Sequence, residues 1–254
     1  MAVDVVVVNY HTDELLADFI YSYAQNAWEG CTLTAVHVEV NQLPKLFKQV
    51  YDHTAMGFTE NVGYARACNA GAHRGHNDVI LLANADTLLS DGLRECHDAL
   101  MAHEDWGILG PRQTNEQNLI TAGGIFGTET SIGQRGWNQP DAGQFDAVEE
   151  AMSVSGSLYF IKRKVWDELT QCQYMQDMFP GIEGAFIPTQ HYYEETCCSY
   201  HARNHGYKCI FYGPVKMTHY WHKASSHGGY ADQQVEPSKR LMREFLGSHG
   251  IVCE

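Results

Sequence analysis

One segment of the chain reads Leu81-Leu82-Ala83-Asn84-Ala85-Asp86-Thr87-Leu88-Leu89, an apolar run interrupted by an Asn-x-Asp tripeptide. The first apolar part predicts a buried strand that ends in an amide and a carboxylate at the edge of a sheet. Oxygen ligands in that position suit a hard divalent cation that meets a diphosphate. The segment therefore indicates a metal-assisted nucleotide site, although Asn84 and Asp86 can also be turn residues that cap a strand.

Strand and helix patterns alternate on both sides of this segment. The run Val5-Val6-Val7-Val8 is typical of a central parallel strand buried on both faces. Further strands are predicted at 33–40, 79–83 and 106–109, and helices at 13–27, after the capping residue Asn61, and at 91–103. The pattern from residue 4 to 110 predicts an α/β fold with one Rossmann-like, mostly parallel sheet and helices on both faces.

The second half of the chain is less regular. Its glycine-rich residues 123–150 predict a long loop or a pair of edge strands, which would form a smaller sheet or loop region beside the site. The remaining predictions are a strand at 154–161, a helix at 165–169, an irregular stretch at 171–192, a helix at 193–205, a strand at 208–212 ended by Gly213-Pro214, and an amphipathic helix that begins at Pro237. This last helix could pack on the core, act as a lid or join a partner subunit.

Composition narrows the class of protein. Among 254 residues, 17 Lys and Arg stand against 31 Asp and Glu, and the net charge of −14 disfavours broad nucleic-acid binding. No apolar run has the length of a membrane span, and the start Met1-Ala2-Val3-Asp4 lacks the basic residues of a signal peptide. The eight cysteines contain no Cys-x-x-Cys pair, which indicates reduced thiols. We expect a soluble, cytoplasmic protein without an integral membrane segment.

Two further groups of residues carry chemistry. Glu194 and Glu195 stand at a predicted helix start, where the helix dipole stabilises a carboxylate, and the preceding His191-Tyr192-Tyr193 suits a pocket wall. His219 stands between aromatic residues at a predicted strand end, from which it could bind the same cation as Asp86. A first-turn charge and a structural histidine are the alternatives for these residues.

In their order and spacing these motifs resemble the family 2 glycosyltransferases of the GT-A fold, most closely their rhamnosyltransferase-like branch. The resemblance covers roughly residues 3–225. The matching segments are Val5–Tyr10, Glu60–Ala65 with Asn69 and Gly71, Leu81–Asp86, Gly107–Pro111, Val154–Ser157 with Lys162-Arg163, Tyr193–Glu195 through Arg203 to Tyr207, and His219. Each motif is weak alone, and seven in order are specific.

The resemblance implies roles for individual residues. Asp86 would bind Mn²⁺ or Mg²⁺ on the donor diphosphate with His219 as a late metal ligand, and Asn84 would make an indirect metal contact or a ribose contact. Glu195 would be the catalytic base with Glu194 beside it. The remaining donor-binding residues would be Asn9, Glu39, Asn61, Gly63 and Gly156.

Three positions depart from the family pattern. The chain has Glu194-Glu195 where the family has Glu-Asp, and Cys197 where a further acid is common. The family's nucleobase-contacting Asp has no plain counterpart, because Glu39 or Asn41 stands there instead. The nucleobase of the donor therefore stays open.

Together with the motifs, the resemblance implies a metal-dependent inverting glycosyltransferase that moves a hexosyl or deoxyhexosyl group from a UDP-, dTDP- or GDP-sugar to an acceptor hydroxyl. The acceptor could be a glycan, a protein or a lipid-linked sugar, and the acidic charge makes a modified nucleobase less favourable. Residues 1–110 would bind the nucleotide sugar, 111–225 would bind the acceptor and carry catalysis, and 226–254 would be a helical extension through which the chain could form an oligomer.

Two other functions compete with this prediction. One is a catalytically inactive GT-A-like module that binds a sugar nucleotide or a glycan, to which the unusual Glu195 and Cys197 lend weight. The other is a sugar nucleotidyltransferase, which would need a glycine-rich, basic phosphate loop after the first strand. Asn9-Tyr10-His11-Thr12-Asp13 is not such a loop.

Overall fold

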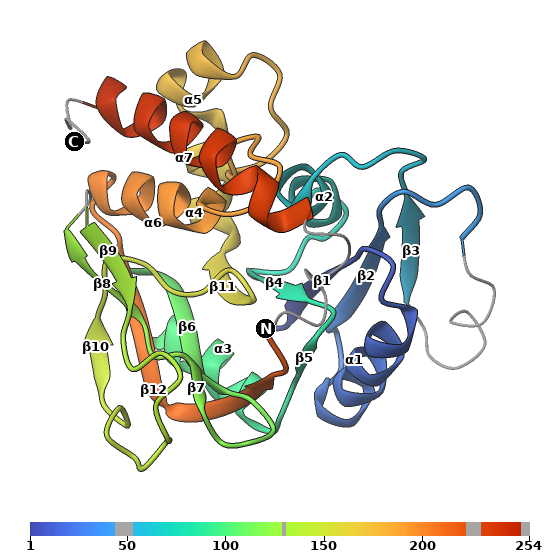
Figure 1. The fold of residues 1–254 in the computed structure, drawn as a ribbon, viewed down its shortest axis with the longest axis vertical. Helices are drawn as coiled ribbons and strands as arrows, with labels where there is room; N and C mark the ends of the chain where they lie inside the picture. Colours follow the sequence, from blue (N-terminus) through green and yellow to red (C-terminus); the bar gives the residue numbers. More distant parts are fainter. Residues whose placement is uncertain (44–52, 129–130, 222–229, 250–254) are drawn as a thin grey trace.

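A computed structural model describes residues 1–43, 53–128, 131–221 and 230–249 of the chain (Figure 1). Its strands are β1 (Val3–Asn9), β2 (Thr32–His37), β3 (Thr54–Gly57), β4 (Val79–Asn84), β5 (Thr87–Leu88), β6 (Trp106–Thr114), β7 (Ile120–Ala122), β8 (Ile125–Thr128), β9 (Ser131–Gln134), β10 (Val148–Glu150), β11 (Leu158–Lys162) and β12 (Lys208–His219). Its helices are α1 (Asp13–Asn26), α2 (Tyr64–Ala72), α3 (Gly92–Ala102), α4 (Arg163–Gln171), α5 (Gln173–Met178), α6 (Glu194–Asn204) and α7 (Tyr230–Ser248).

One large sheet organises the molecule, in the order β10-β12-β6-β11-β4-β1-β2-β3. The strands β4, β1, β2 and β3 run parallel, and β11 pairs antiparallel with β4 and β6. Strand β5 pairs with β12, β7 pairs with β6, and β8 and β9 form a separate two-stranded sheet. The predicted α/β class with a smaller second sheet is confirmed, and residues 123–150 contain edge strands rather than one long loop.

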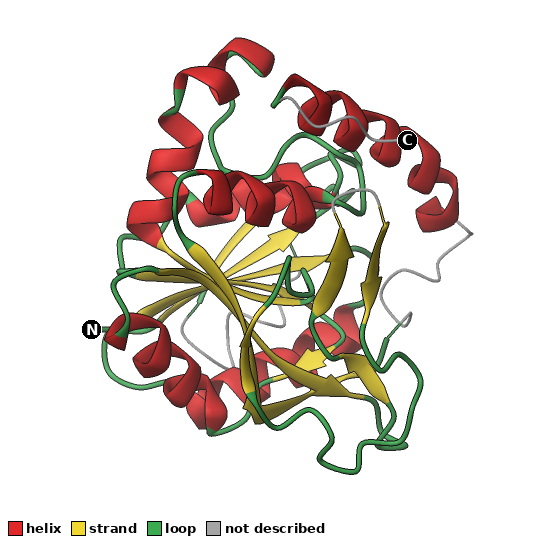
Figure 2. Cartoon of the chain, turned by 90° about the vertical axis from the view of Figure 1, so that its left-hand side faces the viewer, coloured by secondary structure: helices red, strands yellow, loops and turns green. Residues whose placement is uncertain are grey.

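Helices cover both faces of the sheet (Figure 2). Because side chains alternate along a strand, Val5 and Val7 of β1 pack toward α1 and α3, whereas Val6 and Val8 pack toward α2, α4 and α6. Helices α5 and α7 form a third cluster on the outer side of α6, through Met175 and Phe245 among others. None of the described helices combines the length and apolar character needed to cross a membrane.

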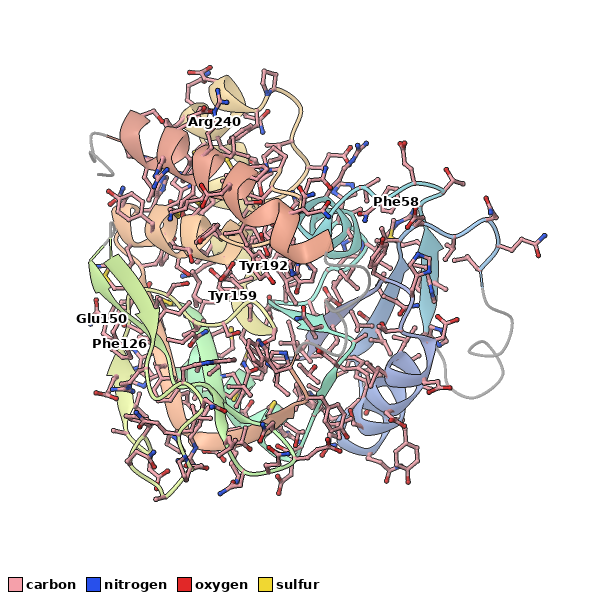
Figure 3. All side chains as sticks on the ribbon, viewed as in Figure 1. Phe58, Phe126, Glu150, Tyr159, Tyr192 and Arg240 are labelled. Carbon is pink, nitrogen blue, oxygen red and sulfur yellow. The ribbon has the colours of Figure 1, made fainter. Side chains whose placement is uncertain are left out.

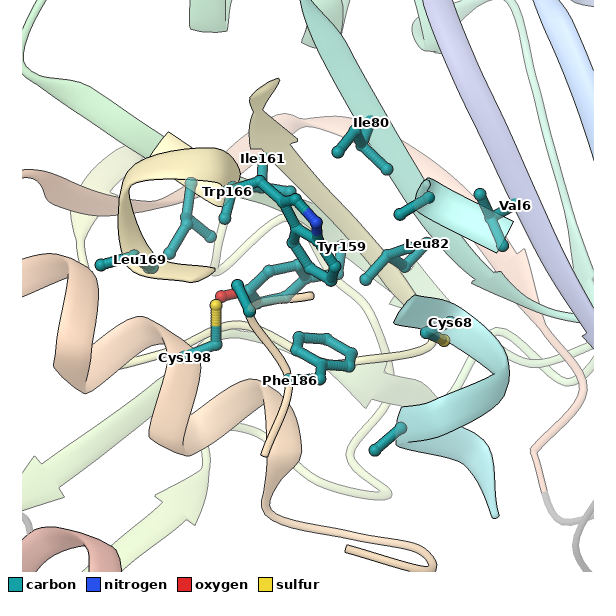
Figure 4. Packing of buried hydrophobic residues seen from close by; sticks show 14 of the residues in the cluster. Val6, Cys68, Ile80, Leu82, Tyr159, Ile161, Trp166, Leu169, Phe186 and Cys198 are labelled. Carbon is teal, nitrogen blue, oxygen red and sulfur yellow. The ribbon is translucent and has the colours of Figure 1, made fainter. Parts of the chain in front are cut away.

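The side chain of Tyr159 anchors α6 to the sheet (Figure 4). It is fully buried on β11, packs against Phe186 with ring centroids 5.5 Å apart, and its hydroxyl lies 2.9 Å from Ser199 Oγ on α6. Ser199 Oγ also lies 2.9 Å from Ser153 Oγ. These buried hydrogen bonds hold the helix that begins with Glu194 at one position over the sheet.

Two glycine-proline pairs lie within strands, contrary to the predicted strand ends. Strand β6 continues through Gly110-Pro111 to Thr114, and β12 continues through Gly213-Pro214 to His219. The parallel pairing of β6 and β12 shifts register between Tyr212 and Lys216, beside both pairs. Proline is tolerated at such a bulge, because no regular ladder hydrogen bond is lost there. Strand β12 continues past this bulge to His219.

Other predicted boundaries were also wrong. Strand β2 ends at His37, and β11 begins at Leu158, so Ser155-Gly156-Ser157 precedes the strand in a turn. Strand β3 was missed, and α5 lies in the stretch predicted to be irregular. Helix α7 begins seven residues before Pro237, because proline removes one amide donor without ending a helix that tertiary contacts support. Gly63, rather than Asn61, is the N-cap of α2.

A buried ion pair joins the start of β1 to α4. The Asp4 carboxylate accepts hydrogen bonds from Thr32 Oγ1 at 2.7 Å, from the Asn77 backbone and side chain at 2.7 Å, and from an Arg163 nitrogen at 2.9 Å. The side chains of Asp4 and Arg163 are only 3% and 16% exposed. Little water therefore reaches these two side chains, and water would not compensate for the loss of one partner.

Asp4→Ala is expected to lower the free energy of unfolding by about 3–5 kcal/mol, because it leaves a buried guanidinium without its counter-charge. Urea denaturation followed by circular dichroism measures this change. The control is Asp18→Ala, which removes an exposed aspartate from α1. Equal unfolding midpoints for the two variants would contradict the assignment.

Candidate active site

A cavity of about 420 Å³ opens where β1, β4 and β12 end and α2 and α6 begin. Tyr192, from the segment before α6, is one of its lining residues and lies near the centre of the view in Figure 3. The predicted site residues that line the cavity are Asn61, Gly63, Asn84, Asp86, Gly156, Glu194, Glu195 and His219. Loops at the carboxyl ends of parallel strands are where α/β sheets bind ligands.

Asp86 and His219 face each other in this cavity. Asp86 follows β4 directly, and the short strand β5 pairs with β12 so that Thr87 lies opposite His219. The two side chains are almost fully buried, and His219 Nε2 lies 3.5 Å from Asp86 Oδ1. The Asp86 carbonyl also accepts a hydrogen bond from the Tyr220 backbone amide at 2.9 Å. Backbone pairing thus holds a carboxylate oxygen and an imidazole nitrogen at one point.

Asn84 closes the end of β4 and lines the same cavity. Its backbone amide donates to the Ser157 carbonyl at 3.0 Å, and its carbonyl accepts from Thr87 Oγ1 at 2.8 Å. These bonds hold the turn between β4 and β5 on which Asp86 stands. The Asn84 backbone therefore has a structural role at the edge of the cavity that the residue lines.

The two glutamates stand on a strained helix start. Tyr192 and Tyr193 have φ angles of 73° and 70°, a left-handed conformation that costs a non-glycine residue about 1–3 kcal/mol. The Glu194 carboxylate is 3% exposed and accepts a hydrogen bond from Thr189 Oγ1 at 2.7 Å. Glu195 is partly exposed, and a Cβ at Gly156 would lie 3.4 Å from its Cβ and Cγ. The Glu195 side chain therefore lies directly against Gly156.

Burial raises the pKa of both glutamates above the ordinary value of 4.5. For Glu195, the second cause of the higher pKa is the nearby negative charge of Glu194. Two carboxyl groups this close favour states in which one of them holds a proton at neutral pH. A carboxylate with a raised pKa in a cavity is a candidate general base.

Asn61, Gly63 and Tyr64 form the wall beside the glutamates. The Asn61 side chain accepts a hydrogen bond from the Gly63 amide at 3.0 Å, and the Tyr64 amide donates to the Gln190 carbonyl at 2.8 Å. Gly63 has a φ of 81°, and a Cβ there would lie 2.8 Å from Gln190 Cα. Only glycine permits this close approach. The Tyr64 hydroxyl donates to the Gly156 carbonyl at 2.8 Å. This hydrogen bond joins the segment that contains Gly63 to the segment that contains Gly156.

Two predicted donor-binding residues lie outside the cavity lining. The Asn9 side chain is buried, where it contacts Asp13 Oδ1 at 2.7 Å and His37 Nδ1 at 3.1 Å and accepts from Thr12. Glu39 is exposed after β2 and lies 3.0 Å from His11 Nε2, which lowers the pKa of its carboxyl group. Their neighbours Tyr10 and Val38 line the cavity instead.

The cavity also has an aromatic rim that the motifs did not identify. Trp137 and Trp221 meet edge to face with ring centroids 3.9 Å apart, and both are more than a third exposed. The lining residues that the sequence prediction missed are Val8, Tyr10, Val38, Tyr64, Thr121, Gln134, Trp137, Ser155, Ser157, Gln190 and Trp221. The predicted pocket wall contributes His191 and Tyr192. An isolated tryptophan in a glycine-rich segment carries no spacing signal, so Trp137 was not identifiable from the sequence.

The donor set of Asp86 and His219 fits a divalent cation. A carboxylate oxygen and an imidazole nitrogen suit Mn²⁺, and Nε2 is the ring nitrogen of His219 that faces Asp86. The other nitrogen, Nδ1, would carry the ring proton when Nε2 binds the ion. The residues present are thus compatible with the metal that the motif implies.

The chain has the GT-A glycosyltransferase fold. The structure of GalNAc-T7 with UDP, GalNAc and Mn²⁺ superposes with a TM-score of 0.65 at 14% identity, over 86% of this chain and 44% of its own. The mannosyltransferase PcManGT from Pyrobaculum calidifontis with GDP-Man and Mn²⁺ gives a TM-score of 0.63 at 13% identity, over 98% of this chain and 64% of its own. TarS from S. aureus, residues 1–349, gives 0.56 at 11% identity, over 98% and 72%.

The chain thus spans less than two thirds of the length of the first two structures. No protein-family model matches the sequence, and no curated protein matches it. At these identities the likeness establishes the fold, and the activity rests on the site.

Proposed function

We propose that the chain is a metal-dependent inverting glycosyltransferase that uses a nucleoside diphosphate sugar. The observation that carries the proposal is the single cavity that joins Asp86 and His219 at two strand ends with Glu194 and Glu195 at a helix start. The GT-A fold, the two candidate cation ligands and the candidate base are all parts that such a reaction needs. The predicted membership of family 2 and of its rhamnosyltransferase-like branch belongs to the same proposal.

Each residue has a role in the proposed mechanism. Asp86 and His219 would hold Mn²⁺ or Mg²⁺, which neutralises the charge of the departing nucleoside diphosphate. Glu195 accepts the proton of the acceptor hydroxyl while the acceptor oxygen bonds to the anomeric carbon on the face opposite the leaving diphosphate oxygen. The bond from the anomeric carbon to the diphosphate breaks in the same displacement, so the configuration inverts. Glu194 sets the charge state of Glu195.

The two substrates would occupy opposite parts of the cavity. The nucleoside would lie toward Tyr10 and Val38 at the ends of β1 and β2, where α/β sheets bind nucleotides. The acceptor would enter past Trp137 and Trp221, because sugar rings pack well on exposed aromatic side chains. UDP and GDP-Man in the similar structures support a UDP- or GDP-sugar donor. The proposal includes dTDP-sugars, because they are nucleoside diphosphate sugars too.

A donor panel tests this proposal. UDP-, dTDP- and GDP-sugars are incubated with the protein and Mn²⁺, and release of the nucleoside diphosphate is measured with and without EDTA. We expect turnover with one nucleotide class that EDTA abolishes. Donor binding without hydrolysis or transfer across the panel and a set of acceptor hydroxyls would favour the inactive binding module instead.

The pH profile distinguishes the two glutamates. A base works in its ionised form, so a raised pKa places the acid limb of kcat/KM well above 4.5, and activity falls as the pH drops through that limb. Glu194→Gln removes the neighbouring charge that raises the Glu195 pKa, so the limb should move to lower pH. Steady-state rates over a pH series measure this shift. Complete inactivation of Glu194→Gln at every pH would make Glu194 the base.

The proposal also covers the two halves of the chain, its compartment and its assembly. We propose that residues 1–110 serve the donor and 111–225 the acceptor and catalysis, and the predicted boundary at 225 falls outside the described residues. Every cysteine in the described part of the chain is a free thiol, which supports work in a reducing compartment such as the cytoplasm. Helix α7 is the surface through which an oligomer would form.

A further inference from the structure

A second cluster of metal-ligand side chains lies on the outer side of α6, away from the cavity. Cys172 stands at the junction of α4 and α5, His201 lies in the last turns of α6, and His205 follows the helix directly as its C-cap. One ligand atom from each of these three residues lies within 4.8 Å of the others. Histidines spaced i and i+4 on a helix present two ligands on one face. We propose that Cys172, His201 and His205 bind a zinc-class cation, with His249 as the fourth ligand.

The distances within the cluster match those of ligands that share one ion. Cys172 Sγ lies 3.3 Å from His201 Nε2. Tetrahedral zinc with Zn–S of about 2.3 Å and Zn–N of about 2.0 Å separates a sulfur and a nitrogen ligand by about 3.5 Å. A small outward movement of the two side chains would therefore admit the ion.

Glu168 orients one of the histidines as metal sites require. Its Oε1 lies 2.9 Å from His205 Nδ1, and its Oε2 accepts a hydrogen bond from the Tyr207 hydroxyl at 2.6 Å. Metal-binding histidines usually donate their second ring N–H to a carboxylate in this way, which fixes the tautomer and leaves Nε2 for the metal. The bonds to Glu168 thus prepare His205 Nε2 as a ligand.

Two buried ring nitrogens without a hydrogen-bond partner, one on His201 and one on His249, bear on the ligand set. His201 is 0% exposed, and its Nδ1 has no hydrogen-bond partner among the described residues. Nε2 of the half-buried His249 also has no hydrogen-bond partner among the described residues, and the ring centroid of His249 lies 5.2 Å from that of His201. Cys172 lies at His201 Nε2, so a cation bound there would leave Nδ1 as the protonated ring nitrogen, whereas a cation at Nε2 of His249 would give that buried atom the partner it lacks. His249 follows α7 directly and lies outside the group of ligand atoms within 4.8 Å of one another, so its ring would have to move toward the other three residues to act as the fourth ligand.

The proposed site would serve structure rather than catalysis. Four protein ligands leave no open position for a substrate, and a thiolate with imidazoles selects zinc over the harder Mn²⁺ or Mg²⁺. The ion would join the end of α7 to α6, which lie side by side in Figure 1. His201 is six residues beyond Glu195, about 9 Å along the helix. The ion would therefore hold the far end of the helix that presents the proposed base.

Cobalt binding tests the proposal on the full chain. Metal-stripped protein carrying Asp86→Ala, which removes the proposed catalytic cation site, is titrated with Co²⁺ and followed by absorption. We expect one Co²⁺ per chain, with an intense thiolate-to-cobalt band and the visible bands of tetrahedral coordination. Adding Cys172→Ser should abolish the thiolate band, whereas the matched control Cys31→Ser, at another half-buried thiol, should retain it. A thiolate band that survives Cys172→Ser, or its absence in folded Asp86→Ala protein, would overturn the proposal.

A second measurement needs no cysteine substitution. Zn²⁺ should raise the Tm of the metal-stripped chain, and Glu168→Gln should weaken Zn²⁺ binding about 10–100-fold, because it removes the acceptor that orients His205. His249→Ala should weaken binding as well. Unchanged Zn²⁺ affinity in both variants would refute the assigned ligand set.

Discussion

Replacing Glu195 with glutamine is expected to reduce sugar transfer by about 10²–10⁴-fold while donor binding is retained, because a general base contributes a factor of that size. The amide preserves the shape of the side chain beside Gly156 but does not accept the acceptor proton. Single-turnover transfer with the preferred donor and Mn²⁺ measures the chemical step. Calorimetric titration with the nucleoside diphosphate measures binding separately.

The matched control for this variant is Glu183→Gln, an exposed glutamate ahead of α6 that does not line the cavity. It should leave transfer unchanged. Transfer at the unmodified rate by Glu195→Gln, with the fold intact, would show that the chain uses another base. Donor binding that is unchanged, with no turnover by either the unmodified chain or Glu195→Gln, would support the inactive binding module.

Asp86→Ala should abolish metal-dependent donor binding. Asp86 is the buried carboxylate that faces His219 at 3.5 Å, and no other acid of the described lining faces this histidine within ion-pair distance. Loss of a direct ligand should cost more than the about 10–100-fold that loss of an orienting partner costs. Titration of the nucleoside diphosphate with Mn²⁺, and again with EDTA, measures the metal-dependent part of the affinity.

Asn84→Ala is the comparison for this prediction, because Asn84 stands two residues away on the same turn and its structural bonds come from its backbone. We expect it to weaken donor binding less than Asp86→Ala does. Donor affinity in Asp86→Ala that equals the unmodified value and does not respond to EDTA would refute the metal role.

The cores of the strands could be predicted, whereas the long strands were predicted too short. Val5–Val8 and Leu81–Ala83 are apolar runs buried on both faces, so composition alone identifies them as central strands. The pairs Gly110-Pro111 and Gly213-Pro214 have the local signal of a strand end. Each pair lies next to the bulge between β6 and β12, and the strand opposite it comes from the other half of the chain. A local sequence signal contains no information about that opposite strand.

The site residues also fall into two groups, those that local sequence patterns identified and those whose surroundings only the structure shows. Local patterns sufficed to propose Asp86, Glu194 and Glu195, because each stands at the end of an element with a recognisable period or cap. Asn9 was assigned to the donor from its motif, yet its side chain is engaged by Thr12, Asp13 and His37. Whether a polar side chain faces a ligand depends on which neighbours bind it first.

The amino-acid sequence by itself therefore determined the α/β class, the central strands and the ends at which carboxylates stand, since hydrophobic period and capping are local properties. Only the tertiary structure decided that Asp86 meets His219, that Trp137 meets Trp221 and that Cys172 meets His201. Those contacts join segments far apart in the chain. They depend on strand register, on the bulge in β12 and on helix packing, which arise from the whole sheet and not from any short segment.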